Sequence, residues 1–256
     1  MFKLKSAGIA LAIGVAGMVG STANATVVTV FDGITAGMAS FNSTVTGAGS
    51  TVNTDVWTSL TSGTSIDRGD YTITRNNGGS MSGVSRGALS GLAISIGPTT
   101  NAPGGSNPRT DPMDYFGGGI TMTFDSAVNA VAFEVEDWAT CCFQPTTDLF
   151  ISFDGGLPIL VASATQSSEG RFPQQGNPSV LIDEIMVAAF DDTGSFTEVS
   201  FWGNGLGEVL FAGGQVRYAL LNQGTLPPSA VPLPAGGLLL LGAMGALGFS
   251  RRKRRS

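Results

Sequence analysis

The sequence has 256 residues, no histidine and a formal net charge of −6, which understates how acidic its middle section is. Residues 26–228 hold all 19 acidic residues, six arginines and no lysine, a formal charge of −13. A surface this negative repels phosphate backbones, so we expect no nucleic-acid partner. The absence of histidine leaves general acid–base chemistry to carboxylates and tyrosines, and the absence of lysine in the middle excludes a phosphate-binding loop.

Residues 1–25 have the features of a secretory signal peptide. Lys3 and Lys5 give a positive start, residues 7–19 are apolar, and Ala23 and Ala25 form an Ala-x-Ala-type cleavage site. The apolar run is too short to span a bilayer comfortably, which disfavours a retained membrane anchor. We therefore predict cleavage after Ala25 and export of the chain.

Short strands and turns dominate the expected structure of residues 26–228. This section is rich in Thr, Ser, Gly, Val and Phe, which favours strands over helices. A short helix near 37–41 is the one helical candidate, and residues 98–114 read as a long loop. The sequence predicts a single all-β domain, a β-sandwich of jelly-roll-like type. Its strands are expected at 27–31, 71–75, 89–96, 119–124, 128–135, 148–153, 158–162, 182–190, 196–203, 208–211 and 215–221.

Three acidic residues, Glu134, Glu136 and Asp137, precede Trp138. On a strand, Glu134 and Glu136 share one face, and paired carboxylates beside a tryptophan are one arrangement that cleaves glycans. Their alternation with apolar residues more simply predicts a half-solvated strand, which we favour. A carboxylate-dependent glycan-cleaving enzyme is therefore the alternative.

Trp57, Trp138 and Trp202 are the candidates for a glycan-binding surface, because exposed indole rings stack on sugars. Asp32, after the first expected strand, and Glu208, near the last, are candidate ligands for a structural calcium ion, which prefers oxygen ligands. No calcium-binding loop motif accompanies them.

Cys141 and Cys142 are the two cysteines of the chain, and they are adjacent. In an oxidising compartment they can form a vicinal disulfide, although such a bond strains the peptide between them. Packing in the reduced state and bonds to other chains are equally open. No Cys-x-x-Cys motif indicates a redox enzyme.

The last segment, residues 229–256, combines three parts. The motif Val231-Pro232-Leu233-Pro234-Ala235 is held extended by its prolines. Residues 235–250 are uncharged and apolar, and as a helix they approach the thickness of a bilayer core. The basic end then stays on the cytoplasmic side by the positive-inside rule. It consists of Arg251, Arg252, Lys253, Arg254 and Arg255.

This tail closely resembles the PEP-CTERM class of sorting signals, in its VPLPA variant. The resemblance implies that an exosortase, a membrane cysteine transpeptidase, recognises the tail while it is held in the inner membrane. It also implies cleavage near the proline motif and release of the body to the envelope or extracellular matrix of a Gram-negative bacterium that makes exopolysaccharide. An ordinary single-span anchor is the competing interpretation.

Together, the signal peptide, the β-sandwich expected for residues 26–228 and the sorting tail predict a non-catalytic binding or structural module associated with extracellular polysaccharide. The glycan-cleaving enzyme and a self-associating matrix protein are the two competing hypotheses.

Overall fold

The computed structural model describes residues 27–97, 111–138, 147–164, 172–174, 177–182, 184–191, 193–203 and 209–226. The predicted signal peptide, the sorting tail, both cysteines and Glu208 lie outside these ranges. Within them, the longest helix is too short to cross a membrane.

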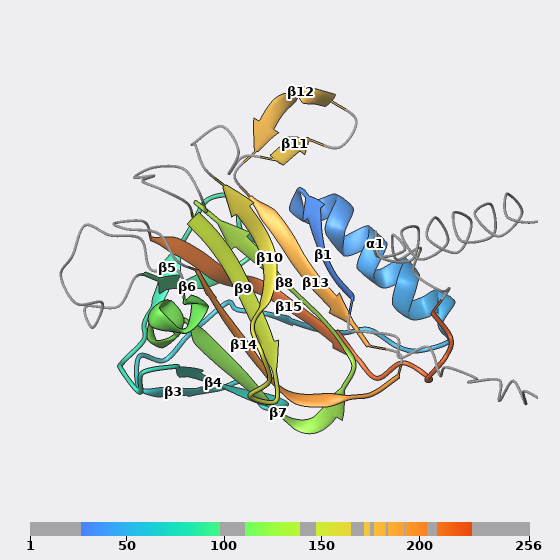
Figure 1. The fold of residues 1–256 in the computed structure, drawn as a ribbon, viewed down its shortest axis with the longest axis horizontal. Coiled ribbons are helices and arrows are strands. Elements are labelled where there is room, and N and C mark those ends of the chain that lie inside the picture. The colour runs from blue at the N-terminus through green and yellow to red at the C-terminus, as the bar shows by residue number, and fades with distance from the viewer. Residues whose placement is uncertain are drawn as a thin grey trace, which may run out of the picture.

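Strands account for most of the described chain (Figure 1). In order along the chain, the elements are β1 (Val27–Asp32), α1 (Ile34–Gly47), β2 (Asn53–Val56), β3 (Ser65–Asp67), β4 (Tyr71–Arg75), β5 (Gly83–Ser85), β6 (Leu92–Ile96), the short 3-10 helix η1 (Pro112–Gly118), β7 (Ile120–Val128), β8 (Ala130–Glu136), β9 (Thr147–Phe153), β10 (Ile159–Ala164), β11 (Phe172–Gln174), β12 (Asn177–Ile182), β13 (Ile185–Phe190), β14 (Phe196–Gly203) and β15 (Leu210–Ala219).

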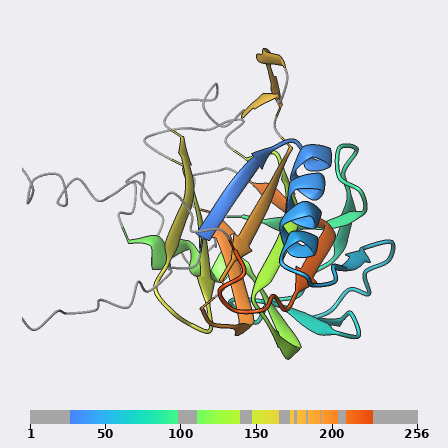
Figure 2. The same cartoon turned by 90° about the vertical axis from the view of Figure 1, so that its right-hand side faces the viewer.

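The strands form two antiparallel sheets that pack face to face, together with the small β11–β12 pair. The first, here the α1 sheet, has the order β1-β13-β8-β15-β6-β5, and β2 also pairs with β15. The second, the η1 sheet, has the order β10-β9-β14-β7-β4-β3. This arrangement agrees with the predicted β-sandwich. The two layers, with α1 outside the first, are visible in Figures 1 and 2.

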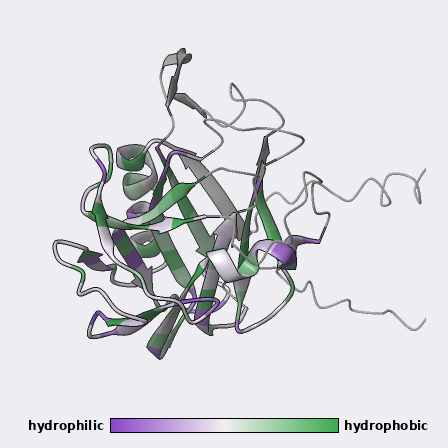
Figure 3. Cartoon of the chain, turned by 90° about the vertical axis from the view of Figure 1, so that its left-hand side faces the viewer, coloured by the Kyte–Doolittle hydropathy of each residue, from purple (hydrophilic) through white to green (hydrophobic). Residues whose placement is uncertain are grey.

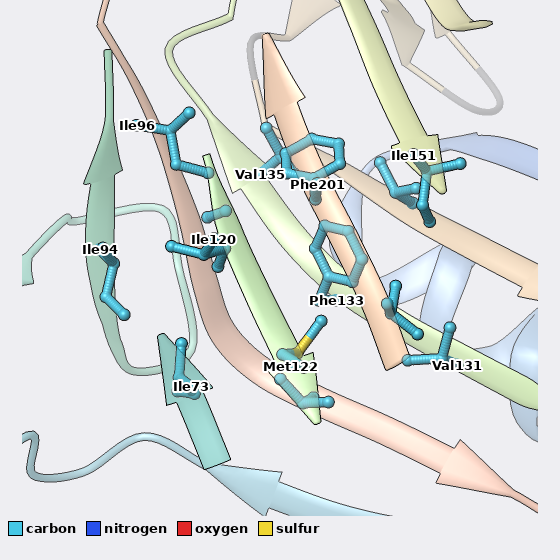
Figure 4. Packing of buried hydrophobic residues seen from close by; sticks show 14 of the residues in the cluster. Ile73, Ile94, Ile96, Ile120, Met122, Val131, Phe133, Val135, Ile151 and Phe201 are labelled. Atoms are coloured by element: carbon cyan, nitrogen blue, oxygen red, sulfur yellow. The ribbon is translucent and has the colours of Figure 1, made fainter. Parts of the chain in front are cut away.

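The main core lies between the sheets. Val131, Phe133 and Val135 of β8 point inward and are at most 1% exposed. The ring of Phe133 meets that of Phe201 edge to face, with centroids 4.8 Å apart. Figure 4 shows these side chains from both sheets, and Figure 3 shows hydrophobic residues running along the strands.

The prediction that β8 is half-solvated is wrong. Its alternate residues Ala130, Ala132 and Glu134 are 0% exposed as well, because α1 covers the two alanines and the segment before β6 reaches Glu134 through Ser90. The helix spans 14 residues and buries Ile34, Phe41 and Val45, with Phe41 stacked on Phe190 at 5.2 Å.

The helix is much longer than the predicted 37–41. Its Ser, Thr and Gly residues have poor helix propensity, so its stability comes from packing on the sheet.

Candidate functional site

The three tryptophans are structural. Trp57, Trp138 and Trp202 are 0%, 1% and 0% exposed, so the prediction that they form an exposed glycan-binding surface is wrong. The indole N–H of Trp57 donates to the Tyr71 hydroxyl at 2.7 Å, and that of Trp202 donates to the carbonyl of Pro112 at 2.9 Å. Large aromatic rings stabilise a core strongly once their polar atoms find partners, as the rings of Trp57 and Trp202 do here.

Glu134 and Glu136 share one face of β8, as predicted, but their surroundings differ. Glu134 is 0% exposed and accepts a hydrogen bond from the Ser90 N–H, whereas Glu136 forms an ion pair with Arg86 at 3.2 Å. Arg86 also pairs with Asp137 at 3.0 Å and lies 4.0 Å over the ring of Phe211. Glycoside cleavage needs two carboxyl groups that both reach the substrate. The geometry therefore does not support a glycan-cleaving enzyme that uses these residues.

The calcium prediction stays a prediction. Asp32 is the last residue of β1, where its backbone lies opposite Ile185, and Glu208 is outside the described residues. Among the residues that are described, no cluster of three or more acidic or cysteine side chains could hold a metal ion.

A groove at one end of the sandwich is a candidate for a binding site, because polar side chains from both sheets line it. It has a volume of about 330 Å³ and draws on both sheets. We call it the end groove. It is lined by Asn53, Asp70, Phe124, Asp125, Ser126, Ala127, Val128, Tyr218 and Leu220.

A bulge in β7 builds one wall of the end groove. Phe196 of β14 pairs with Val128, but Glu198 pairs with Thr123, so the residues from Asp125 to Ala127 fall outside the ladder. These three residues are exposed within a largely buried strand. The Asp125 N–H donates to the carbonyl of Asp70 at 3.0 Å, which places the two carboxylates on the same groove. Bulges commonly redirect side chains in this way.

The floor of the end groove is aromatic. The Tyr218 ring packs against Phe124 at 5.2 Å and edge-on against Tyr71 at 5.9 Å. Its hydroxyl donates a short hydrogen bond to the Asp70 carboxylate. Burial, reinforced by that bond, raises the pKa of Tyr218 well above its usual value, so the hydroxyl stays protonated.

A buried polar network supports the floor from behind. Arg68 donates from Nε and Nη2 to the two oxygens of Asp55 at 2.9 and 2.6 Å. Tyr71 donates to Asp55 at 2.7 Å while accepting from Trp57. Burial alone would raise the pKa of Asp55, but the bonds from Arg68 and Tyr71 lower it below the usual range.

The chemistry of the end groove favours uncharged ligands rich in hydroxyl groups. Asp70 and Asp125 offer exposed carboxylate oxygens that accept hydrogen bonds, and Asn53 and Ser126 offer groups that both donate and accept. Leu220, 59% exposed, adds an apolar rim. The described residues that line the groove include no basic side chain, so anionic ligands meet repulsion.

Sequence reasoning does not find these groove residues. It predicts only a short link between strands at Asp125, Ser126 and Ala127, and their polarity inside a strand-like run is the one signal that marks them. Asp70 and Tyr218 meet because β4 and β15 come together in space, which local sequence does not reveal.

Comparisons with known proteins do not identify a family for the chain. No family model matches it, and no curated protein matches it. Among solved structures it is similar to a "Carbohydrate binding module family29", with 10% identity and a TM-score of 0.31, over 72% of this chain and 99% of that one. A second, titled "CBM29-2 mutant D114A", has the same identity and TM-score, over 70% and 93%. A TM-score this low carries no argument about ligand or ancestry.

Proposed function

We propose that this chain is an exported envelope or matrix protein, sorted through its C-terminal tail, whose β-sandwich body binds neutral extracellular polysaccharide in the end groove. The observation that carries the binding part is the end groove itself. It combines exposed hydrogen-bonding groups with an aromatic floor and an apolar rim. The sorting part is supported by the order of motif, apolar span and basic end in residues 231–255.

The sorting proposal predicts both ends of the mature chain. Mass spectrometry of protein from whole cells should find an N-terminus after Ala25 and a C-terminus near the 231–235 motif. Replacing Pro232 and Pro234 with alanine should leave the tail uncut, because the extended motif that the transpeptidase would bind is lost. Replacing Pro227 and Pro228 instead is the matched control. An intact product in the cytosol would contradict the proposal. The same spectra give the oxidation state of Cys141 and Cys142.

The binding proposal predicts that Asp125→Asn weakens affinity for a neutral glycan by about tenfold, the effect of losing roughly one charge-assisted hydrogen bond. Titration calorimetry of the full chain against a panel of neutral and acidic glycans, with calcium present, measures it. Asp67→Asn is the control, since Asp67 is exposed on β3 and does not line the groove, and an asparagine there can still accept the hydrogen bond from the Gly69 N–H. If no glycan binds, or if both variants weaken binding equally, the end groove is not the site.

Self-association is a second candidate function, favoured by the β10 edge. Leu160 on β10 is 55% exposed, and Leu157 in the turn before it is 88% exposed. In the described chain β10 pairs with β9 alone, so it forms an edge of the η1 sheet. Uncharged edges of this kind promote pairing between chains. Light scattering should show assembly that grows with concentration and is reduced in Leu160→Lys, and a monomer at all concentrations would exclude this function.

A further inference from the structure

Glu134 is a carboxyl group buried on the face of the α1 sheet that is covered by α1 together with the segment before β6. In the sheet it lies between Met186 of β13 and Gly213 of β15, and its side chain is 0% exposed. Oε2 accepts a hydrogen bond from the Ser90 N–H at 2.7 Å, while the buried Oε1 has no partner among the described residues. A buried carboxylate that is hydrogen-bonded by Ser90 alone in the described chain, with one oxygen left without a partner, is far less stable than the neutral acid in the same place.

The carboxyl of Glu134 is packed so closely that a neighbouring glycine could not carry a side chain. Gly214 has a φ of +62°, and a Cβ there would lie 2.0 Å from Oε2 of Glu134. The same Cβ would lie 3.2 Å from Leu89, which belongs to an apolar cluster with Ile34 and Ala93. Met38 and Phe211 pack against that cluster, so the first turns of α1 close this region of the sheet.

Arg217 of β15 connects this face of the sheet to the helix. Its guanidinium donates to Oδ1 of Asn42 at 2.6 Å and to Sδ of Met38 at 3.4 Å, both on α1. A third bond, at 2.8 Å, goes to Gln215. These three acceptors are uncharged. The register of β15 places Arg217 opposite Ala132, two residues from Glu134 on the same face of β8, where the two charged groups influence each other.

Among the described residues, the other charged groups around Glu134 do not connect it to α1 as Arg217 does. Arg86, on the segment before β6, is shared by Glu136 and Asp137. The sequences of α1, β6 and β13 contain no titratable residue. Burial raises the pKa of Glu134 above its usual value, against weaker opposing effects from Ser90 and Arg217.

We propose that Glu134 is a proton-operated latch on α1. With the carboxyl protonated, Arg217 holds the helix through Asn42 and Met38, and the helix stays closed over the sheet. When the proton passes to solvent, the carboxylate attracts Arg217 away from the helix and draws in water, which releases the first half of α1. This latch is independent of the proposed polysaccharide binding.

The direction of the pH dependence follows from linkage. The carboxyl has a raised pKa in the closed state and an ordinary one, near 4.5, in the open state. Closure is therefore strongest at low pH and weakens as pH rises. The equilibrium constant for opening of α1 should increase about tenfold per pH unit between the two pKa values of Glu134, and it should be constant above the higher one.

Hydrogen exchange of the full chain, read by mass spectrometry between pH 4 and 9 and corrected for intrinsic exchange, tests the latch. Peptides covering 34–47 should open at least tenfold more at high pH, while peptides from 196–203 should not change. Glu134→Gln should abolish the pH dependence, and Glu136→Gln, on the same face of β8, should keep it. A flat wild-type profile would overturn the latch even if no variant folds, and so would an unchanged profile in Glu134→Gln.

Discussion

Replacing Gly213 with alanine should destabilise the protein by about 2–4 kcal/mol, the sum of overpacking in the core and of strain in the backbone. An added Cβ would lie 2.2 Å from Cζ3 of Trp57, whose ring is 0% exposed and cannot move into solvent. Gly213 also has a φ of +138°, which L side chains rarely adopt. The β15 bulge thus makes room for two buried side chains, Trp57 at Gly213 and Glu134 at Gly214.

Urea unfolding followed by tryptophan fluorescence measures this loss of unfolding free energy. Gly155→Ala is the matched control, because Gly155 has a φ of +67° but nothing within 4 Å of its added Cβ. That change should cost only about 1 kcal/mol of backbone strain. Equal losses of unfolding free energy in the two variants would show that the contact with Trp57 does not contribute to the effect.

Local chemistry predicts part of this fold well. The expected hairpin at 148–153 and 158–162 is confirmed as β9 and β10. Its turn uses Asp154 and Gly155 at φ of 48° and 67°, which suits an Asp-Gly sequence between two strands. Such turns depend on a few neighbouring residues, so sequence alone is enough to predict them.

Features that depend on distant contacts are not predictable in the same way. Alternation along β8 indicates a solvent-facing side, but α1 and the segment before β6 cover it, and Glu134 is buried there. The prediction of exposed tryptophans fails because composition does not say which face of the sandwich a ring joins. The end groove forms where β2, β7 and β15 meet, and only the pairing of β2 with β15 brings Asn53 opposite Tyr218.

Asp55→Asn should cost about 2–4 kcal/mol, because it leaves the guanidinium of Arg68 without its charged partner in a largely buried place. The side chains of Arg68 and Asp55 are 14% and 20% exposed, and Tyr71 and Trp57 extend the network into the core. In a double-mutant cycle with Arg68→Gln, the second change should cost much less once the first is made. Additive losses would show that the pair contributes nothing as a unit.

The same variant also separates the acid sensitivity of this network from that of Glu134. The folded-state pKa of Asp55 is lowered, so the stability it contributes is present above the ordinary carboxyl range and is lost as pH falls through the folded value. Glu134 acts in the opposite direction, because its raised pKa weakens closure as pH rises. Asp55→Asn should therefore flatten the acid side of the stability profile and leave the alkaline side unchanged. Asp67→Asn, which changes an exposed carboxylate on β3, should preserve both sides.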